Sequence, residues 1–281
     1  MLQFKKIKMG KKINIIILLY LVHLNLLAQG NSTKIPDRTI TISGIKTEFL
    51  FPHENISGSI LVLPGWNFSR TDICENSEFC NLALKKGYVL IMPDMQKSVY
   101  ASQLYPETRN DWRSFPTLTW VIDSLISYCQ KELKLLLPGQ NNFLFGISTG
   151  GRGVAMISIY SENIFIAGAA LSGDYNQLAD TSDNLMRGYY GEFFKFPERW
   201  KGKDNPLMNA NKLKIPLFLA HGKSDNIVPF NQTLNFYDTI NKLNPGIGHK
   251  IVLKDNAGHN YKFWGSEYNE VFDFFQEHEE K

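Results

Sequence analysis

Short apolar runs alternate with amphipathic stretches along most of this chain. Strands are predicted at residues 59–63, 88–92, 164–171, 215–222 and 249–253, and at the apolar run that ends before Gly146. Helices are predicted between them, for example at 78–86 and 118–135. Strands that alternate with helices favour an α/β fold, in which a mostly parallel central sheet carries helices on both faces.

A glycine-flanked serine follows the apolar run that begins at Asn141. The sequence Gly146-Ile147-Ser148-Thr149-Gly150-Gly151 then leads into a helical pattern. A sharp turn from strand to helix strains the residue at its apex and projects its side chain from the sheet edge, and the glycines on either side leave room for the turn. The five-residue pattern alone is common by chance, but the strand before it and the helix after it make Ser148 a candidate nucleophile.

An acid and a base follow at two later strand ends. Asp225 lies in the loop after the predicted strand 215–222, and His259 lies in the loop after 249–253. A serine hydroxyl needs a neutral imidazole to accept its proton as it attacks a carbonyl, and a carboxylate on the other ring nitrogen fixes the tautomer. Ser148, Asp225 and His259 therefore predict nucleophilic catalysis, with activity that falls as the medium becomes acidic through the free imidazole pKa of ~6.5.

These motifs resemble those of the α/β-hydrolase superfamily, most of all its secreted esterase, polyester-depolymerase and dienelactone-hydrolase-like branches. The similarity runs from about residue 60 to about residue 275. Its anchors are the serine turn, His221-Gly222-Lys223-Ser224-Asp225 with Val228-Pro229, and Gly258-His259. The resemblance implies a single α/β-hydrolase domain with a small cap insertion.

The resemblance also implies an oxyanion hole, which holds the negative oxygen formed when the serine attacks. In the family, one backbone N–H belongs to the residue after the nucleophile, here Thr149, and the other to the loop after an earlier strand, here at Trp66. Pro64 departs from the histidine of many relatives, which leaves the Trp66 N–H available but alters what orients the loop. The Trp66 indole is also a candidate wall of the substrate pocket, with core packing as the alternative.

Other residues compete for the acid and base roles. Asp174 is an alternative acid, because some relatives place the acid after the strand at 164–171, although it equally suits capping a turn. Asp255 is close to His259 in sequence and fits a turn. His221 lies at a strand end, where it would pack beneath the acid loop, and His249 begins a strand. Neither histidine follows a glycine in a loop at the expected distance, which leaves His259 as the base.

Two long connections leave the same edge of the predicted sheet. Residues 93–115 carry Trp112 and two arginines, and residues 175–214 carry several aromatic side chains and are long enough for a small helical cap. Such loops overhang the nucleophile, so Trp112 is a candidate substrate contact. Arg152 is another, because its charge opposes the helix dipole and indicates a carboxylate partner from substrate or protein. Ordinary ion pairs and packing of the cap are the alternative uses.

The amino terminus has the pattern of a signal peptide. Five lysines precede an apolar region that ends at Ala28. Polar residues interrupt this region, it is shorter than the ~20 residues that span a bilayer, and no cysteine follows it to accept a lipid. We therefore expect cleavage after residue 28 and export to a bacterial periplasm or exterior without a membrane anchor; an uncleaved anchor is the alternative.

Cleavage would change the charge of the protein. The 281 residues carry 30 Lys+Arg against 27 Asp+Glu, and loss of the five lysines leaves 25 against 27, so a net +3 becomes −2. This balance gives no reason to expect nucleic acid as a partner. Residues 29–281 suit one α/β domain, because no repeat, charge block or low-complexity tract marks a second one.

Three cysteines are consistent with export. Cys74 and Cys80 flank a turn before the predicted helix at 78–86, and they either pair in an oxidising compartment or remain free. Cys129 lies in a helical stretch and suits a buried apolar position. No cluster of His, Cys and carboxylate side chains has metal-ligand spacing, so we expect no metal and no cofactor.

The sequence thus predicts a secreted serine hydrolase that cleaves a carboxylic ester, on a small molecule or a polymer, through an acyl-enzyme intermediate. A serine peptidase of the prolyl-oligopeptidase type is the alternative, since such enzymes share the Gly-x-Ser-x-Gly-Gly turn; they usually carry another large domain, for which this chain has no room. A catalytically silent surface-binding protein is a further alternative, which the intact set of Ser148, Asp225 and His259 disfavours.

Overall fold

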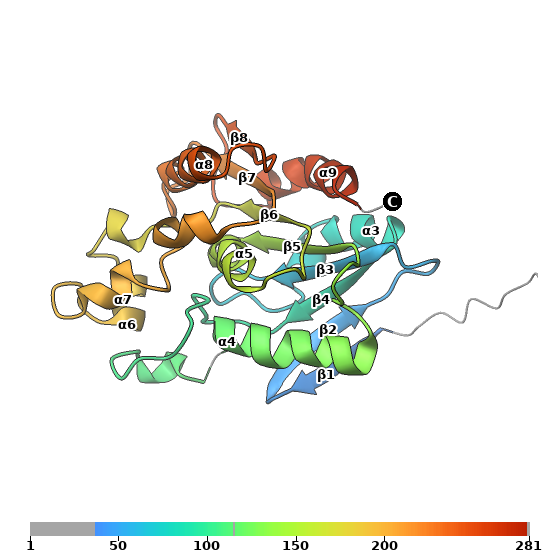
Figure 1. The fold of residues 1–281 in the computed structure, drawn as a ribbon, viewed down its shortest axis with the longest axis horizontal. Helices are drawn as coiled ribbons and strands as arrows, with labels where there is room; N and C mark the ends of the chain where they lie inside the picture. The colour runs from blue at the N-terminus through green and yellow to red at the C-terminus, as the bar shows by residue number, and fades with distance from the viewer. Residues whose placement is uncertain (1–36, 115, 280–281) are drawn as a thin grey trace, which may run out of the picture. The chain divides into compact units, whose positions relative to one another are not determined.

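An eight-stranded sheet organises the part of the chain that the computed structural model describes, residues 37–114 and 116–279 (Figure 1). The strands are β1 (Arg38–Ile42), β2 (Ile45–Leu50), β3 (Gly58–Leu63), β4 (Tyr88–Pro93), β5 (Asn142–Ile147), β6 (Ala167–Leu171), β7 (Leu217–Gly222) and β8 (Lys250–Lys254). They lie in the order β1-β2-β4-β3-β5-β6-β7-β8. Within this sheet, β2 pairs antiparallel with β1 and β4, and all other pairs are parallel. The predicted α/β fold with a mostly parallel sheet is confirmed.

Helices connect the strands from β3 onward, and one more helix follows β8. They are α2 (Asp72–Asn76), α3 (Phe79–Lys85), α4 (Leu118–Trp120), α5 (Thr149–Tyr160), α6 (Asn184–Tyr190), α7 (Pro197–Lys201), α8 (Asn231–Leu243) and α9 (Tyr261–Glu277). Helix α4 continues through the π-helical segments η2 (Val121–Ile126) and η3 (Cys129–Leu133). Short 3-10 turns are η1 (Asn110–Trp112), η4 (Gln177–Ala179) and η5 (Leu207–Lys212). The predicted helix at 118–135 stops two residues early, because Lys134 adopts a left-handed φ of 58°.

Alternate residues of each buried strand face opposite sides of the sheet and build two cores. In β3, Leu61 and Leu63 join the core beneath α4, η2, α5 and α8. Ile60 and Val62 join the core beneath α3 and α9. Helices therefore cover both faces of the sheet, as Figure 1 shows.

A third apolar cluster joins the two long connections. Its buried members are Val99, Ala101, Trp112, Met186, Tyr189, Tyr190 and Trp200. The Arg109 amide donates to Gly188 O at 2.9 Å, and Arg199 of α7 forms an ion pair with Glu107. The insertion at 175–214, which contains α6 and α7, is therefore held against the connection that follows β4.

The predictions for the cysteines and for the amino terminus can be compared with the described residues. A disulfide joins Cys74 of α2 to Cys80 of α3, so the paired alternative holds, and Cys129 is free and buried as predicted. The predicted signal peptide, residues 1–28, lies outside the described residues. Within residues 37–114 and 116–279, no helix combines the length and apolar character needed to cross a bilayer.

Candidate active site

Ser148 occupies the turn between β5 and α5. Its backbone φ of 56° with ψ of −127° lies outside the regions that residues with a Cβ ordinarily adopt, as expected at the apex of a strand-to-helix turn. A Cβ at Gly146 would lie 2.2 Å from Gly150 O, and a Cβ at Gly150 would lie 2.0 Å from Leu63 O. The glycines are therefore required because the turn packs tightly against its own helix and against β3.

The three residues predicted for catalysis lie in one hydrogen-bonded chain. Ser148 Oγ is 2.9 Å from His259 Nε2, and His259 Nδ1 is 2.7 Å from Asp225 Oδ2. The ionised carboxylate only accepts hydrogen bonds, so the His259 proton lies on Nδ1 and Nε2 is left to accept from the serine hydroxyl. This is the tautomer that general-base catalysis requires.

The Asp225 carboxylate is held through both oxygens. Oδ1 accepts from the amides of Ile227 at 2.8 Å and Val228 at 2.9 Å, and Oδ2 also lies 3.1 Å from Nε2 of His221. Burial would by itself raise the pKa of this carboxyl, but the hydrogen bonds from His221, His259 and Val228 hold it well below its usual range. Asp225 is therefore ionised at neutral pH.

The acid and base loops are attached to each other. The Ser224 amide donates to Ala257 O at 2.9 Å, which ties the loop after β7 to the loop after β8. Gly222 permits this approach, because a Cβ there would lie 2.3 Å from Ala257 O. On its other side, the His259 ring packs against Trp264 of α9, with ring centroids 5.1 Å apart and planes at 82°. These contacts fix the imidazole between the acid and the serine.

Two backbone amides beside Ser148 match the predicted oxyanion donors. Thr149 begins α5, where the first amides of a helix have no intrahelical acceptor. The Trp66 loop passes close to the nucleophile, since a Cβ at Gly65 would lie 3.1 Å from Ser148 Cβ. Among the described residues, no protein group accepts a hydrogen bond from the amide of Thr149 or Trp66. These two amides are therefore the candidate donors to an anionic oxygen.

Trp112 does not take the position predicted for a substrate contact. Its indole packs edge to face against Trp66, with centroids 4.7 Å apart, and only 6% of the residue is exposed. The Arg109 guanidinium lies 4.8 Å from the Trp112 ring centroid. Trp112 therefore supports Trp66 from within the protein, and Trp66, which is half-buried, is the tryptophan that a ligand can reach.

Arg152 also departs from its predicted contact with substrate. The side chain is completely buried, its Nη1 donates to Asp174 Oδ2 at 3.1 Å, and its Nε donates to Val99 O at 3.1 Å. Burial disfavours the charged guanidinium, but the Tyr190 hydroxyl and the Asp174 carboxylate raise its pKa above the ordinary value. The carboxylate partner expected from the helix dipole is thus a protein group, and Arg152 connects the nucleophile's helix to the cap.

Two supporting residues go beyond the sequence prediction. The Tyr100 hydroxyl donates to Pro64 O at 2.9 Å, and its ring lies so close to α5 that a Cβ at Gly153 would be 2.8 Å from it. Tyr100 thereby holds the Trp66 loop, but it has a φ of 55° and no local motif marks it. His221 was expected beneath the acid loop and lies there; its hydrogen bond to the acid is the part that no sequence pattern indicates.

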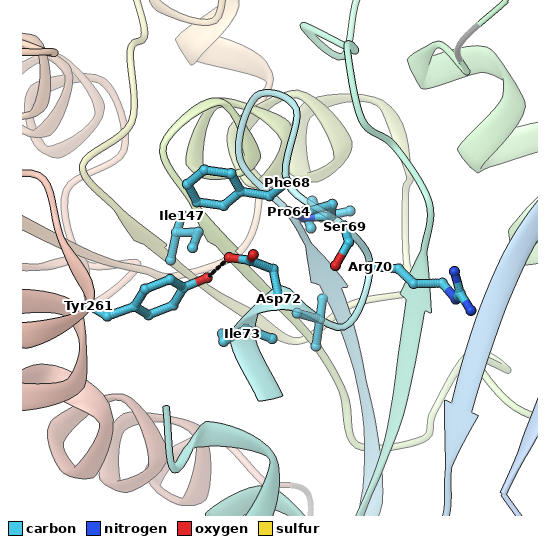
Figure 2. A pocket seen from close by; sticks show the side chains of 10 residues that line it. Pro64, Phe68, Ser69, Arg70, Asp72, Ile73, Ile147 and Tyr261 are labelled. Atoms are coloured by element: carbon cyan, nitrogen blue, oxygen red, sulfur yellow. Dashed lines mark hydrogen bonds between the residues drawn. The ribbon is translucent and has the colours of Figure 1, made fainter. Parts of the chain in front are cut away.

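A small cavity lies behind the Trp66 loop (Figure 2). Its lining comes from β3 and the following loop, from α2, from the end of β5 and from the start of α9: Val62, Leu63, Pro64, Phe68, Ser69, Arg70, Asp72, Ile73, Ile147 and Tyr261. The Tyr261 hydroxyl donates to Asp72 Oδ2 at 2.5 Å across it. A volume of about 10 Å³ holds about one water molecule, so this cavity is too small to receive an acyl group.

In the described part of the chain, no group of three or more His, Cys, Asp and Glu side chains is arranged to hold a metal ion.

Three solved structures with a similar fold carry the names of hydrolases or peptidases. Fluorophosphonate-binding serine hydrolase F of Staphylococcus aureus has a TM-score of 0.67 at 16% identity, over 86% of this chain and 99% of that chain. S-formylglutathione hydrolase from Agrobacterium tumefaciens has a TM-score of 0.68 at 15% identity, over 87% and 95%. Acylaminoacyl peptidase of Pyrococcus horikoshii has a TM-score of 0.69 at 18% identity, over 92% of this chain but 44% of that chain. At these identities the likeness shows the α/β-hydrolase fold.

Family membership comes from the sequence itself. No curated protein sequence matches the chain significantly. The model of the prolyl oligopeptidase family, in contrast, matches residues 81–281, a range that contains Ser148, Asp225 and His259. Because this match spans most of the chain, the protein belongs to the prolyl oligopeptidase family and is a serine hydrolase.

Proposed function

We propose that the protein is an esterase that hydrolyses a carboxylic ester through a covalent acyl-enzyme on Ser148. The observation that carries this proposal is the hydrogen-bonded chain from Ser148 Oγ through His259 to the ionised Asp225. A serine at a strained turn, a base of the correct tautomer and two free amides are the parts that acyl transfer needs. Each of them is accounted for by a named group.

In the proposed reaction these groups act in sequence. His259 Nε2 takes the proton of Ser148 as Oγ bonds to the ester carbonyl carbon, and the amides of Thr149 and Trp66 donate to the oxygen that becomes negative. His259 then gives that proton to the departing alcohol oxygen as the carbon–oxygen bond breaks. A water molecule repeats the sequence on the acyl-enzyme, which releases the acid and restores the serine.

Whole-chain similarity favours an ester over a peptide substrate. The two hydrolases whose own chains are covered almost completely are the fluorophosphonate-binding serine hydrolase and the S-formylglutathione hydrolase. The acylaminoacyl peptidase shares less than half of its length with this chain. Membership of the prolyl oligopeptidase family makes a serine peptidase the second candidate.

The proposed place of action is outside the cytoplasm. Residues 1–28 have the basic and apolar regions of a signal peptide. The Cys74–Cys80 disulfide also suits an oxidising compartment. The proposed partner is a small-molecule or polymer-borne ester, with no nucleic acid partner and no membrane anchor in the mature chain.

A substrate panel tests the proposed reaction. Mature protein is assayed on esters of varied acyl length, on acetylated and feruloylated sugars, and on short blocked peptides, with Ser148→Ala as the matched control. We expect the largest kcat/KM on an ester, and its loss in Ser148→Ala. Cleavage of peptides without cleavage of any ester would reject the esterase and support the peptidase.

A further inference from the structure

A second histidine contacts the carboxylate of Asp225. His221, in β7, is completely buried, and its Nε2 lies 3.1 Å from Asp225 Oδ2 and 2.9 Å from Val228 O. Its Nδ1 lies 2.7 Å from Oγ1 of Thr233 in α8, which is also fully buried. The ring therefore joins a core strand, the acid loop and a helix.

These contacts define the tautomer of His221. The Asp225 carboxylate and the Val228 carbonyl both accept hydrogen bonds, so the proton between them and the ring belongs to Nε2. In the tautomer with its proton on Nε2, Nδ1 accepts from the hydroxyl of Thr233. This histidine is a donor to the acid and has no lone pair available for the serine.

His221 donates to the same carboxylate oxygen, Asp225 Oδ2, that binds His259. Asp225 Oδ2 also binds His259 Nδ1, at 2.7 Å, while Oδ1 binds the amides of Ile227 and Val228. A carboxylate with donors on both oxygens cannot turn about its Cβ–Cγ bond without breaking several of them. Oδ2 must face the His259 ring when that ring gains the proton of Ser148, and these hydrogen bonds hold Oδ2 in that position.

We infer that His221 is a positioning residue, whose Nε2–H keeps the Asp225 carboxylate turned toward His259. This inference rests on the proposed function, because it assigns His221 to the same proton transfer. A residue that merely filled space beneath the acid loop would need neither the second contact on Oδ2 nor a fixed tautomer.

The first test replaces His221 in two ways. His221→Leu removes both ring nitrogens and keeps an apolar side chain, whereas His221→Gln can place an amide N–H near the position of Nε2. Active sites are counted by titration with a fluorophosphonate, and kcat is expressed per titrated site on the best ester. We expect His221→Leu to lose about 10- to 100-fold in kcat with little change in KM, and His221→Gln to recover most of the loss.

His249 supplies the matched control. It is also a buried histidine, but it accepts from the Leu217 amide at the amino-terminal ends of β7 and β8, away from the active site. We expect His249→Leu to keep the wild-type kcat per titrated site even where its stability falls. An equal loss of kcat in His221→Leu and His249→Leu, or none in His221→Leu, would overturn the inference.

If the proposed function is wrong, these experiments give a different result from the one expected if only the role of His221 is wrong. A wild-type protein that neither reacts with fluorophosphonate nor cleaves any substrate rejects the serine hydrolase mechanism, and the role of His221 with it. An active wild type with an unimpaired His221→Leu variant rejects only the role of His221.

A measurement on the wild type keeps the inference testable if His221→Leu does not fold. In protein labelled with ¹⁵N-histidine, the signal of His221 is assigned by its absence from His221→Gln. We expect a proton on Nε2. A ring with its proton on Nδ1 alone would overturn the inference.

Discussion

Asp225 and Asp174 follow neighbouring parallel strands, yet their carboxylates have different partners. Asp225 binds His259, whereas Asp174 forms a 3.1 Å ion pair with the buried Arg152. A carboxylate that orients the base acts on the reaction rate, and a carboxylate that neutralises a buried arginine acts on folding. The two aspartates are therefore separable by experiment.

The first prediction compares these two aspartates. Asp225→Asn should lower kcat/KM about 10⁴-fold, because the imidazole loses the anion that fixes its tautomer and stabilises its charged form. Asp174→Asn should retain most of the kcat/KM and lower the free energy of unfolding, because Arg152 stays buried without its counter-charge. Steady-state kinetics and urea unfolding of both variants check this. A larger kinetic loss in Asp174→Asn would assign the acid to that residue instead.

Local motifs explain which site residues were predictable. Ser148 and Thr149 belong to a turn whose glycines are adjacent in sequence, and Asp225 and His259 follow strands whose apolar runs are continuous. The partners of Arg152 and the burial of Trp112 depend on packing between distant segments, which leaves no trace in local sequence. At both positions the structure has a buried side chain where the local sequence indicated a candidate substrate contact.

At the scale of elements, the turn from β5 to α5 depends on backbone contacts that admit no side chain. Gly150→Ala would bring a Cβ against the Leu63 carbonyl of β3, so this variant should lose about 1–3 kcal/mol or more of unfolding free energy and react poorly with fluorophosphonate. Gly265→Ala is the control, since Gly265 lies exposed in α9 with its nearest atom 3.8 Å from the added Cβ. That variant should gain roughly 0.5–1 kcal/mol. Equal behaviour of the two variants would contradict this account of the turn.

A second prediction at this scale concerns the stability of the fold at acid pH. His249 lies just before β8, and burial lowers its pKa from 6.5 to about 4. The unfolded chain binds the proton more readily than the folded chain, so the free energy of unfolding should fall as the pH drops from about 6.5 to about 4. Across this pH window, protonation of His249 alone should lower the free energy of unfolding by about 3 kcal/mol.

Two variants check the acid prediction. His249→Asn removes the titration and can still accept from the Leu217 amide, so its unfolding free energy should depend less on pH in this window. His53→Asn replaces an exposed histidine and should follow the wild type. An unchanged pH dependence in His249→Asn would show that other groups control acid unfolding.

Most of the predicted strands are buried on both faces, and β8 is the exception, because it was predicted although its residues are exposed or only partly buried. Strands β3 to β7 are continuous apolar runs because helices cover the parallel sheet on both sides. The β1–β2 hairpin lies at the edge of the sheet, with eight of its eleven strand residues partly or fully exposed, so it has no such run. The π-helical course of η2 and η3 likewise has no signature in apolar spacing.

At the scale of the whole molecule, the proposed export would decide where the reaction takes place. Expression of the full chain in a bacterial host should give a protein outside the cytoplasm whose first residue is Gln29, since signal peptidases cut after small residues such as Ala28. Amino-terminal sequencing and intact mass check this. Replacement Ala28→Tyr should block cleavage and leave the five lysines on the chain. Uncleaved wild-type protein confined to the cytoplasm would contradict the proposed export.

Covalent labelling of the mature protein tests the central claim most directly. The protein is treated with a fluorophosphonate, and the adduct is located by peptide mass mapping in the wild type, Ser148→Ala and Asp225→Asn. We predict a single adduct on Ser148, none in Ser148→Ala, and much slower reaction in Asp225→Asn. An adduct on another residue, or an unlabelled wild type, would contradict the assignment of Ser148 as the nucleophile.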